Sequence, residues 1–316
     1  MTPLPRPTRR AATAGGLLLP LGALAACADP SSTPAAGGSG DEAAGAADGE
    51  TTAETTIDTS GSQEPLRAEA DEELASRVPP ELAERGTLVV GGTATTPPLT
   101  FLADDNSTTL GSEVDIARLV ADTLGLDFEH QLTSWDTWPL KLEAGDYDAV
   151  FSNVGVNDER LERYDFASYR AAFMTFLVTT DSGLELGDPA SISGRIIAVS
   201  AATNQERILT DWNDQLTADG QEPAELRHYS NDADVLLALG AGRVDAYFAP
   251  YATLTYTASV RDDVLTQGTV NAGWPDETLV AGTFVRGSGL ADLASQAIER
   301  LIADGTYAQV LERWGL

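Results

Sequence analysis

Strand-like and helix-like patterns alternate along the chain from about residue 84. Short apolar runs typical of buried strands are followed by segments in which apolar residues recur every three or four positions. The segment 112–124 is the clearest helix, with Ser112 as its expected N-cap and Gly125 as its end. Such alternation is typical of parallel strands joined by crossover helices. The expected strands are 87–92, 127–132, 147–151, 195–200, 225–229 and 243–248, and further helices are expected at 135–144, 204–216 and 233–239.

Two distant segments repeat one local pattern. Residues 142–153 read LEAGDYDAVFSN and residues 239–250 read LGAGRVDAYFAP. Each combines a helix end, a glycine turn, an aspartate and an apolar strand. The repetition predicts an α/β protein with two lobes of related construction.

The N-terminus has the layout of a bacterial export signal. Three arginines precede an apolar run of about 14 residues that ends in small residues. The run stops at LAAC, which resembles the lipobox of bacterial lipoproteins, and Cys27 is the only cysteine of the chain. We therefore expect residues 1–26 to be a signal peptide and Cys27 to be lipidated, although a chance cysteine in a cleaved signal is the alternative. The pair Arg9 and Arg10 leaves export by the Sec or the twin-arginine route open.

Residues 27–83 differ in composition from residues 84–316. They are small, polar and acidic, with few residues able to form a core. We expect this segment to be a disordered tether between the membrane and a globular head.

Net charge excludes one class of partner. The chain has 49 acidic and 19 basic residues, a formal charge of −30, and Lys141 is its only lysine. Without a basic surface, binding to the phosphates of a nucleic acid is not expected.

Five motifs, in order, resemble the bacterial extracellular solute-binding proteins of family 3, the polar amino-acid group of ABC-transporter receptors. The resemblance covers roughly residues 84–316. It implies a type II periplasmic-binding-protein fold, with lobe 1 at 84–178 plus 279–316, lobe 2 at 181–267, and hinge segments at 173–180 and 266–278. The motifs are the segment 86–92 with the helix after it, SWDTWPLKLEAGDYDAVFSNVGVNDERLERYDFASYR, ISGRIIAVSAATNQERI, ALGAGRVDAYFAP and LIADGTYAQVLERWGL.

Arg160 is the residue to which the resemblance gives the most specific role. Asn157 is a plausible N-cap, so Arg160 falls in the first turn of a helix, where a cation is disfavoured. In the family, the arginine at this place clamps the ligand's α-carboxylate, which a guanidinium contacts at two points. An ion pair with Asp158 or Asp165 on a solvated face is the alternative. Trp135 falls where the family has an aromatic residue beside the cleft, and core packing is its alternative role.

The second lobe is expected to supply a matching turn. Thr203 and Glu206 form a capping box, which by itself indicates only the start of a helix. In the family, this turn directs its hydroxyl and N–H groups at the same carboxylate, which implicates Thr203 and Asn204. The family's glycine before the threonine is Ala202 here. Asn153 and Thr96 are further expected ligand-binding residues, and Thr96 stands where many members have an aromatic residue.

Two positions depart from the family pattern. Gly155 replaces a threonine or serine whose hydroxyl contacts the ligand, so only its backbone N–H remains. Pro250 replaces an aspartate that pairs with the ligand's α-ammonium. A buried ammonium without an anion is costly. The ligand therefore either lacks this amine or presents it to another acid, for which the candidates are Glu113, Asp276 and Glu277.

The resemblance implies a monomeric, lipid-anchored, extracytoplasmic receptor for a small polar carboxylate-bearing solute, which it delivers to an ABC permease. No cofactor or metal is expected. An enzyme of the dehydratase type on the same fold is disfavoured, because His130 and His228 lie in no metal spacing and near no candidate serine. A ligand-sensing lipoprotein that serves no transporter is the other alternative. The sequence does not identify the solute, its affinity or the permease.

Overall fold

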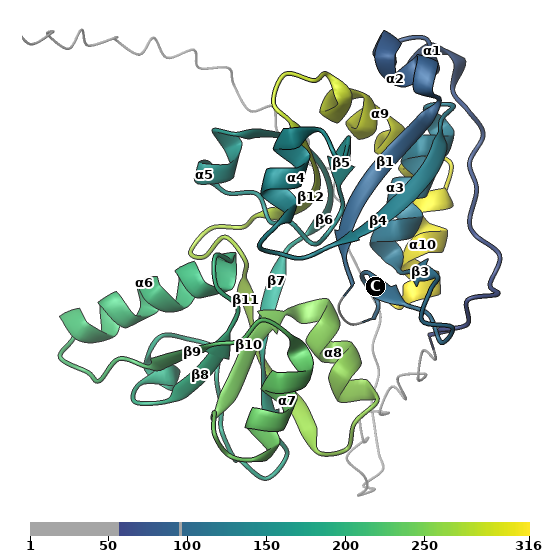
Figure 1. Cartoon of the computed structure of the whole chain (residues 1–316). Helices are drawn as coiled ribbons and strands as arrows, with labels where there is room; N and C mark the ends of the chain where they lie inside the picture. The colour runs from purple at the N-terminus through teal and green to yellow at the C-terminus, as the bar shows by residue number, and fades with distance from the viewer. Residues whose placement is uncertain (1–56, 95–96) are drawn as a thin grey trace, which may run out of the picture. The chain divides into compact units, whose positions relative to one another are not determined.

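Two five-stranded sheets form the centres of two lobes (Figure 1). The structure is a computed structural model, and it describes residues 57–94 and 97–316. This architecture confirms the predicted two-lobed α/β fold. The first sheet has the order β4 (Asp127–Thr133), β1 (Thr87–Thr93), β5 (Ala149–Val150), β12 (Leu279–Val285) and β6 (Tyr164–Ala171), and the second has the order β11 (Val264–Asn271), β7 (Phe173–Thr179), β10 (Ala246–Pro250), β8 (Ile196–Val199) and β9 (Glu225–His228).

Parallel strands with crossover helices build the centre of each lobe, as the sequence predicts. β1 lies between β4 and β5 and is parallel to both, and β8 has the same relation to β9 and β10. The connections carry α3 (Ser112–Thr123) and α4 (Trp138–Ala144) in lobe 1, and α6 (Asn204–Ala218) and α7 (Asp232–Gly240) in lobe 2. One detail of the prediction is wrong, because the N-cap of α3 is Gly111 and not Ser112. Gly111 has φ 129° and passes so close to Leu99 that a Cβ there would meet its carbonyl oxygen at 1.9 Å.

The two faces of the second sheet bury different helices. Neighbouring residues of β7 point to opposite faces, so Phe176 and Leu177 join different parts of the core. Phe176 stacks on Phe248 with 4.4 Å between ring centroids, and Trp212 of α6 packs beside both rings. Leu177 instead packs with Leu239 of α7 and with α8 (Tyr251–Ser259). Lobe 2 is therefore a sheet between α6 and the pair α7 and α8.

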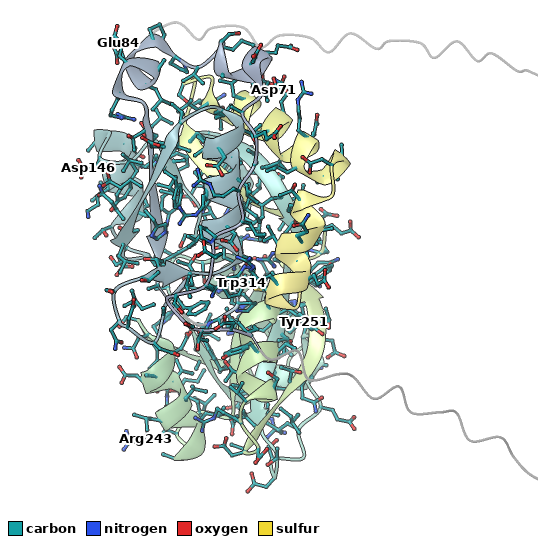
Figure 2. All side chains as sticks on the ribbon, turned by 90° about the vertical axis from the view of Figure 1, so that its right-hand side faces the viewer. Asp71, Glu84, Asp146, Arg243, Tyr251 and Trp314 are labelled. Atoms are coloured by element: carbon teal, nitrogen blue, oxygen red, sulfur yellow. The ribbon has the colours of Figure 1, made fainter. Side chains whose placement is uncertain are left out.

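Lobe 1 is layered in the same way. α3 packs with α9 (Leu290–Ala303) and α10 (Thr306–Trp314), whereas α4 contributes Trp138 and Leu142 to a separate cluster with Tyr147. Trp314 lies at the end of α10 (Figure 2) and donates from Nε1 to Asp115 at 2.8 Å. Smaller elements are the hairpin of β2 (Phe101–Leu102) and β3 (Thr109–Leu110), the one-turn helix α5 (Asp158–Leu161) and the 3-10 turn η1 (Ala190–Ile192). Among the described helices, none has both the length and the apolar character to cross a membrane.

Two adjacent segments connect the lobes, and one of them lies earlier than predicted. β6 belongs to the first sheet and β7 to the second, so the first crossing is at Ala172. The prediction that residues 173–178 belong to lobe 1 is therefore wrong. The second crossing runs between β11 and β12, and the two are hydrogen-bonded, from Ala172 N to Thr278 O and from Ala272 N to Ala172 O, both at 3.0 Å. This pairing makes the crossings a single two-stranded hinge.

Residues 57–83 are part of the globular head, which corrects their assignment to the tether. Arg67 forms two hydrogen bonds of 2.8 Å with Asp122 of α3, and Asp71 pairs with Arg300 of α9 at 2.8 Å. Asp71 also caps α1 (Glu72–Ala75), whose Leu74 is fully buried, and α2 (Pro80–Arg85) leads into β1. The few leucines of this segment are enough to hold it in place, because they pack against a surface that the rest of the lobe already forms. The predicted signal peptide, Cys27 and the tether up to residue 56 lie outside the described residues.

His130 on β4 predicts a pH-dependent loss of stability. Neither ring nitrogen has a hydrogen-bond partner within residues 57–94 and 97–316, and burial, together with the charge of Arg118, lowers the pKa of His130 to about 4. The unfolded chain takes up this proton near pH 6.5, so the folded state loses stability as the pH falls from about 6.5 to 4. Urea unfolding at pH 7 and pH 4.5 should show the parent losing up to about 3 kcal/mol more than His130→Phe. Equal losses in both proteins would contradict the buried, neutral ring.

Candidate functional site

Arg160 reaches from lobe 1 to lobe 2. It lies in α5, where Asn157 Oδ1 caps the helix by accepting from Arg160 N at 2.9 Å. Its guanidinium donates to Gly155 O at 2.8 Å and to Ala202 O of lobe 2 at 3.3 Å, and it lies 5.3 Å from the ring centre of Trp135. Within the described part of the chain it forms no ion pair, so the alternative of a pair with Asp158 or Asp165 is not observed. Burial lowers the pKa of Arg160, and a bound anion would offset that cost.

Trp135 belongs to the contact between the lobes, and Trp138 belongs to the core. Trp135 precedes α4, which begins three residues later than the helix predicted from position 135. Its Nε1 donates to Ala202 O at 3.3 Å, the same carbonyl that Arg160 contacts. Trp138 is 2% exposed and packs against Tyr164. One carbonyl of lobe 2 thus receives two donors of lobe 1, and the lobes are in direct contact.

The turn before α6 has the predicted cap, but its hydroxyl is already engaged. Thr203 Oγ1 accepts from Glu206 N at 3.2 Å and donates to Ser200 O at 2.6 Å. Glu206 reaches back to Ala202 N, at 2.7 Å, and not to the cap residue itself. Ala202 has φ 55°, a left-handed conformation that favours glycine, which agrees with its replacing the family's glycine.

Gly155 makes room for Asn204 of the opposite lobe. A Cβ at position 155 would lie 2.5 Å from Asn204 Nδ2, so a side chain there would force the amide away. Asn204 is 4% exposed, and its Oδ1 accepts from Asn157 Nδ2 at 2.8 Å. Its Nδ2 has no hydrogen-bond partner in the part of the chain that the structure describes. The loss of the family's hydroxyl at 155 is thus accompanied by a close approach of an amide from lobe 2.

Glu113 and Arg170 hold Asn153 at the floor of the cleft. Asn153 has φ 50°; its N–H donates to Glu113 Oε1 at 2.8 Å and its Oδ1 accepts from Arg170 at 2.7 Å. Glu113 is 1% exposed, also accepts from Tyr169 Oη at 2.7 Å, and has a pKa raised by burial. Arg170 is not among the predicted residues. In the sequence, Arg170 is a single arginine in a largely apolar stretch. Such a residue is equally expected on the solvent-exposed face of a strand, so the pattern does not indicate a site.

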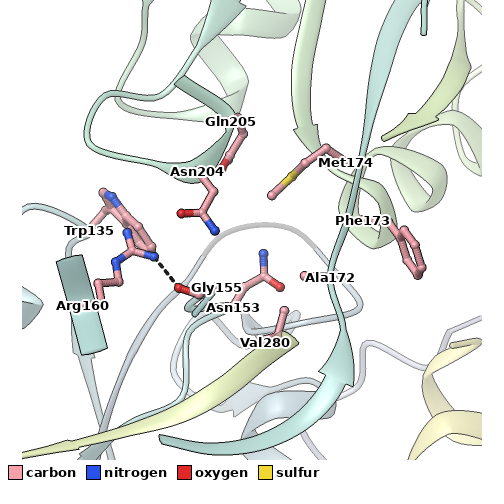
Figure 3. A pocket seen from close by; sticks show the side chains of 10 residues that line it. All are labelled: Trp135, Asn153, Gly155, Arg160, Ala172, Phe173, Met174, Asn204, Gln205 and Val280. Atoms are coloured by element: carbon pink, nitrogen blue, oxygen red, sulfur yellow. Dashed lines mark hydrogen bonds between the residues drawn. The ribbon is translucent and has the colours of Figure 1, made fainter. Parts of the chain in front are cut away.

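Five of the predicted site residues surround one narrow cavity between the lobes (Figure 3). Its volume is about 10 Å³, roughly the space of one water, so a solute enters only when the lobes separate. Thr203 lines a neighbouring cavity of about 540 Å³ between α4, α5 and α6, and Thr96 lies outside the described residues. The residues around the narrow cavity are Trp135, Asn153, Gly155, Arg160, Ala172, Phe173, Met174, Asn204, Gln205 and Val280.

Neither histidine lies at this cavity. His130 is inside lobe 1, and His228 contacts Glu206 at 2.6 Å beyond the start of α6. No cluster of histidine, cysteine and acidic residues among the described positions is arranged to hold a metal ion. The groups at the cavity are suited to binding a solute through hydrogen bonds and charge.

Two lobes that close over an arginine and amide side chains define a solute-binding protein, and sequence comparison identifies its family. The sequence profile of the bacterial extracellular solute-binding proteins, family 3, matches residues 88–316. The chain belongs to this family.

Characterised relatives are amino-acid-binding proteins. The arginine-binding protein ArgT of Corynebacterium glutamicum is 28% identical over 246 residues, which are 77% of this chain and 79% of ArgT. The L-cystine-binding protein TcyJ of Escherichia coli K12 is 29% identical over 252 residues, 79% of this chain and 88% of TcyJ. Both relatives are named for the amino acid that they bind.

Solved structures support the same fold. An ancestral arginine-binding protein bound to arginine has a TM-score of 0.64 at 24% identity, covering 73% of this chain and 98% of its own. The ancestral amino-acid-binding protein AncCDT-1, described as a precursor of cyclohexadienyl dehydratase, also has a TM-score of 0.64 at 24% identity, with 74% and 97% covered.

Proposed function

We propose that this protein captures a small polar solute bearing a carboxylate, an amino acid or a related compound, and delivers it to an ABC importer. The observation that carries the proposal is Arg160, whose guanidinium borders the inter-lobe cavity and has no acidic partner among the described residues. A guanidinium binds a carboxylate at two points with charged hydrogen bonds. The relatives named for arginine and cystine support a solute of this class.

Closure of the lobes is the signal that the permease would read. In the closed arrangement, Ala202 O accepts from both Trp135 and Arg160, and Asn204 accepts from Asn157. These contacts are few and are all made by groups that also border the two cavities. A bound solute would add contacts to both lobes and shift the equilibrium towards closure.

Cys27 is the proposed attachment to the membrane. The LAAC sequence after an apolar run supports cleavage before Cys27 and lipidation of its side chain, which would hold the head on the extracytoplasmic face. Mass spectrometry of the mature protein should find an acylated N-terminal Cys27. A mature N-terminus beyond Cys27 would contradict the anchor without affecting the proposed solute capture.

The experiment for the receptor is a binding screen with recovery of the ligand. The purified full chain is titrated by calorimetry and thermal shift with amino acids, amines and organic acids. A ligand at a hundred times its dissociation constant should stabilise the protein by about 2.7 kcal/mol and return chemically unchanged. Binding confined to compounds without a carboxylate would contradict the proposal. Turnover of the ligand, abolished by a substitution at the cavity, would assign an enzyme.

A further inference from the structure

Hydrogen bonds to neighbouring groups fix which end of each cavity asparagine faces the cavity. Asn157 Oδ1 accepts from Arg160 N, so its other amide atom, Nδ2, must be the one that donates to Asn204. The acceptor in Asn204 is consequently Oδ1, which leaves its Nδ2 at the cavity with both N–H bonds directed away from Asn157. A helix cap on lobe 1 thereby determines that lobe 2 presents a donor.

Arg170 fixes Asn153 in the same way. A guanidinium can only donate, so the Asn153 atom 2.7 Å from it is Oδ1. Asn153 Nδ2 therefore points towards the cavity, where Asn153 and Asn204 approach from opposite lobes (Figure 3). Asn204 Nδ2 is buried without a partner among the described residues, which is costly unless a ligand accepts from it. Together with Arg160, the cavity thus has three fixed donor groups.

The cavity has no fixed anion to receive an ammonium. None of the described residues around it is acidic, and Gln205, the one other polar residue, is neutral. Of the three acids considered from the sequence, Glu113 is buried against Asn153 N and Tyr169, and Asp276 and Glu277 are exposed outside the cavity. The acidic residues Asp136, Glu159, Glu206 and Asp211 line only the neighbouring cavity of about 540 Å³, which Arg160 also borders. In the narrow cavity, an α-ammonium would meet the donors of Asn153 and Asn204 and no carboxylate among the described residues.

We propose that the solute is an organic acid in which the group next to the carboxylate accepts hydrogen bonds and donates none. A 2-oxo carboxylate is the simplest compound of this kind. Arg160 binds the carboxylate, and Asn153 and Asn204 donate to the adjacent oxo oxygen and determine specificity against amino acids. This inference rests on the proposed receptor function, and it narrows the solute from amino acids and related compounds to their amine-free counterparts.

The test compares compounds that differ only at the α-carbon. The full chain is titrated with matched pairs, each made of an amino acid and its 2-oxo acid. The pairs are L-glutamate with 2-oxoglutarate, L-alanine with pyruvate, L-leucine with 4-methyl-2-oxopentanoate, and L-arginine with its 2-oxo analogue. Within the pair that binds, the oxo acid should bind at least about tenfold more tightly, because a charged group left unpaired in a buried site is strongly rejected. An amino acid that binds as tightly as its oxo acid, or more tightly, overturns the inference and leaves the receptor function standing. A panel in which no carboxylate binds overturns both.

The second part of the test replaces the fixed donor, Asn204 Nδ2, with an acceptor. Asn204→Asp keeps the shape and the acceptor for Asn157, but it puts a carboxylate oxygen where Nδ2 meets the solute. Affinity for the oxo acid should fall at least about tenfold, and affinity for the matching amino acid should rise. A misfolded variant cannot gain affinity, so the rise separates specificity from loss of structure.

Asn106→Asp is the matched control. Asn106 is exposed in the turn between β2 and β3, so the same exchange of an amide for a carboxylate there should leave both affinities unchanged. An Asn204→Asp protein that keeps the parent's preference overturns the assignment of Asn204.

Discussion

Replacing Arg160 with alanine is expected to leave the protein folded and to abolish tight binding of its solute. The guanidinium contacts two backbone carbonyls and the face of Trp135, and its removal leaves no acidic partner unpaired among the described residues. A two-point pair with a carboxylate in a closed cleft is worth at least about 1.5 to 3 kcal/mol, which corresponds to a ten- to hundredfold loss of affinity. Calorimetry of the parent and the variant with the same ligand measures this loss.

Two further variants make the Arg160 experiment specific. Arg160→Lys should restore little of the affinity, because an ammonium keeps the charge but cannot form the planar fork. Arg261→Ala removes an arginine that pairs with Asp263 on the surface of lobe 2, and it should bind like the parent. Parent-like affinity of Arg160→Ala would show that this arginine only closes the lobes and does not bind the carboxylate.

Among the substitutions proposed for this protein, Glu113→Ala is expected to lower the free energy of unfolding the most. Its Oε1 accepts from Asn153 N and Tyr169 Oη, and its charge lies 3.9 Å from Arg170, whose side chain is 18% exposed. Alanine would leave a largely buried guanidinium without its anion and two buried donors without acceptors. Breaking a buried pair on one side costs about 3 to 5 kcal/mol, to be measured by urea unfolding at pH 7.

Glu113→Gln is the control that separates hydrogen bonds from charge. Glutamine keeps an oxygen at the position that receives both hydrogen bonds. It lacks the charge that faces Arg170 and the second oxygen, which accepts from Thr100 Oγ1 at 3.4 Å. It should therefore lose less than half as much stability as the alanine variant. If Glu113→Ala unfolded within about 1 kcal/mol of the parent, water would be replacing the carboxylate and the floor of the cleft would be more open than in this structure.

The order of strands and helices followed from the sequence because it depends on local patterns. The strand runs and helix periods place β1, α3, β4 and the corresponding elements of lobe 2 within a few residues of their observed bounds. The motifs from residue 84 onward were sufficient to identify the family. Arg160 could also be selected, since a guanidinium near a helix start is unusual in so acidic a chain.

Tertiary contacts decided what local patterns could not. The apolar run of β7 fits a buried strand of either sheet, and only its pairing with β10 and β11 assigns it to lobe 2. Residues 57–83 resemble a linker in composition, and they are held in place by charges and leucines that meet α3 and α9.

The arrangement of hydrogen-bond donors and acceptors in the cleft is the clearest example of a feature that only the tertiary structure decides. An asparagine can donate or accept, so the sequence by itself leaves the role of Asn204 open. Its orientation is set by Asn157, 47 residues away in the sequence, and that of Asn153 by Arg170, a residue without a distinctive motif. The sequence thus determined the family and the order of elements, and it singled out Arg160, which borders the cavity of the candidate site. The folded chain decided which polar groups face the cavity, because hydrogen-bond direction is fixed only once all the partners are in contact.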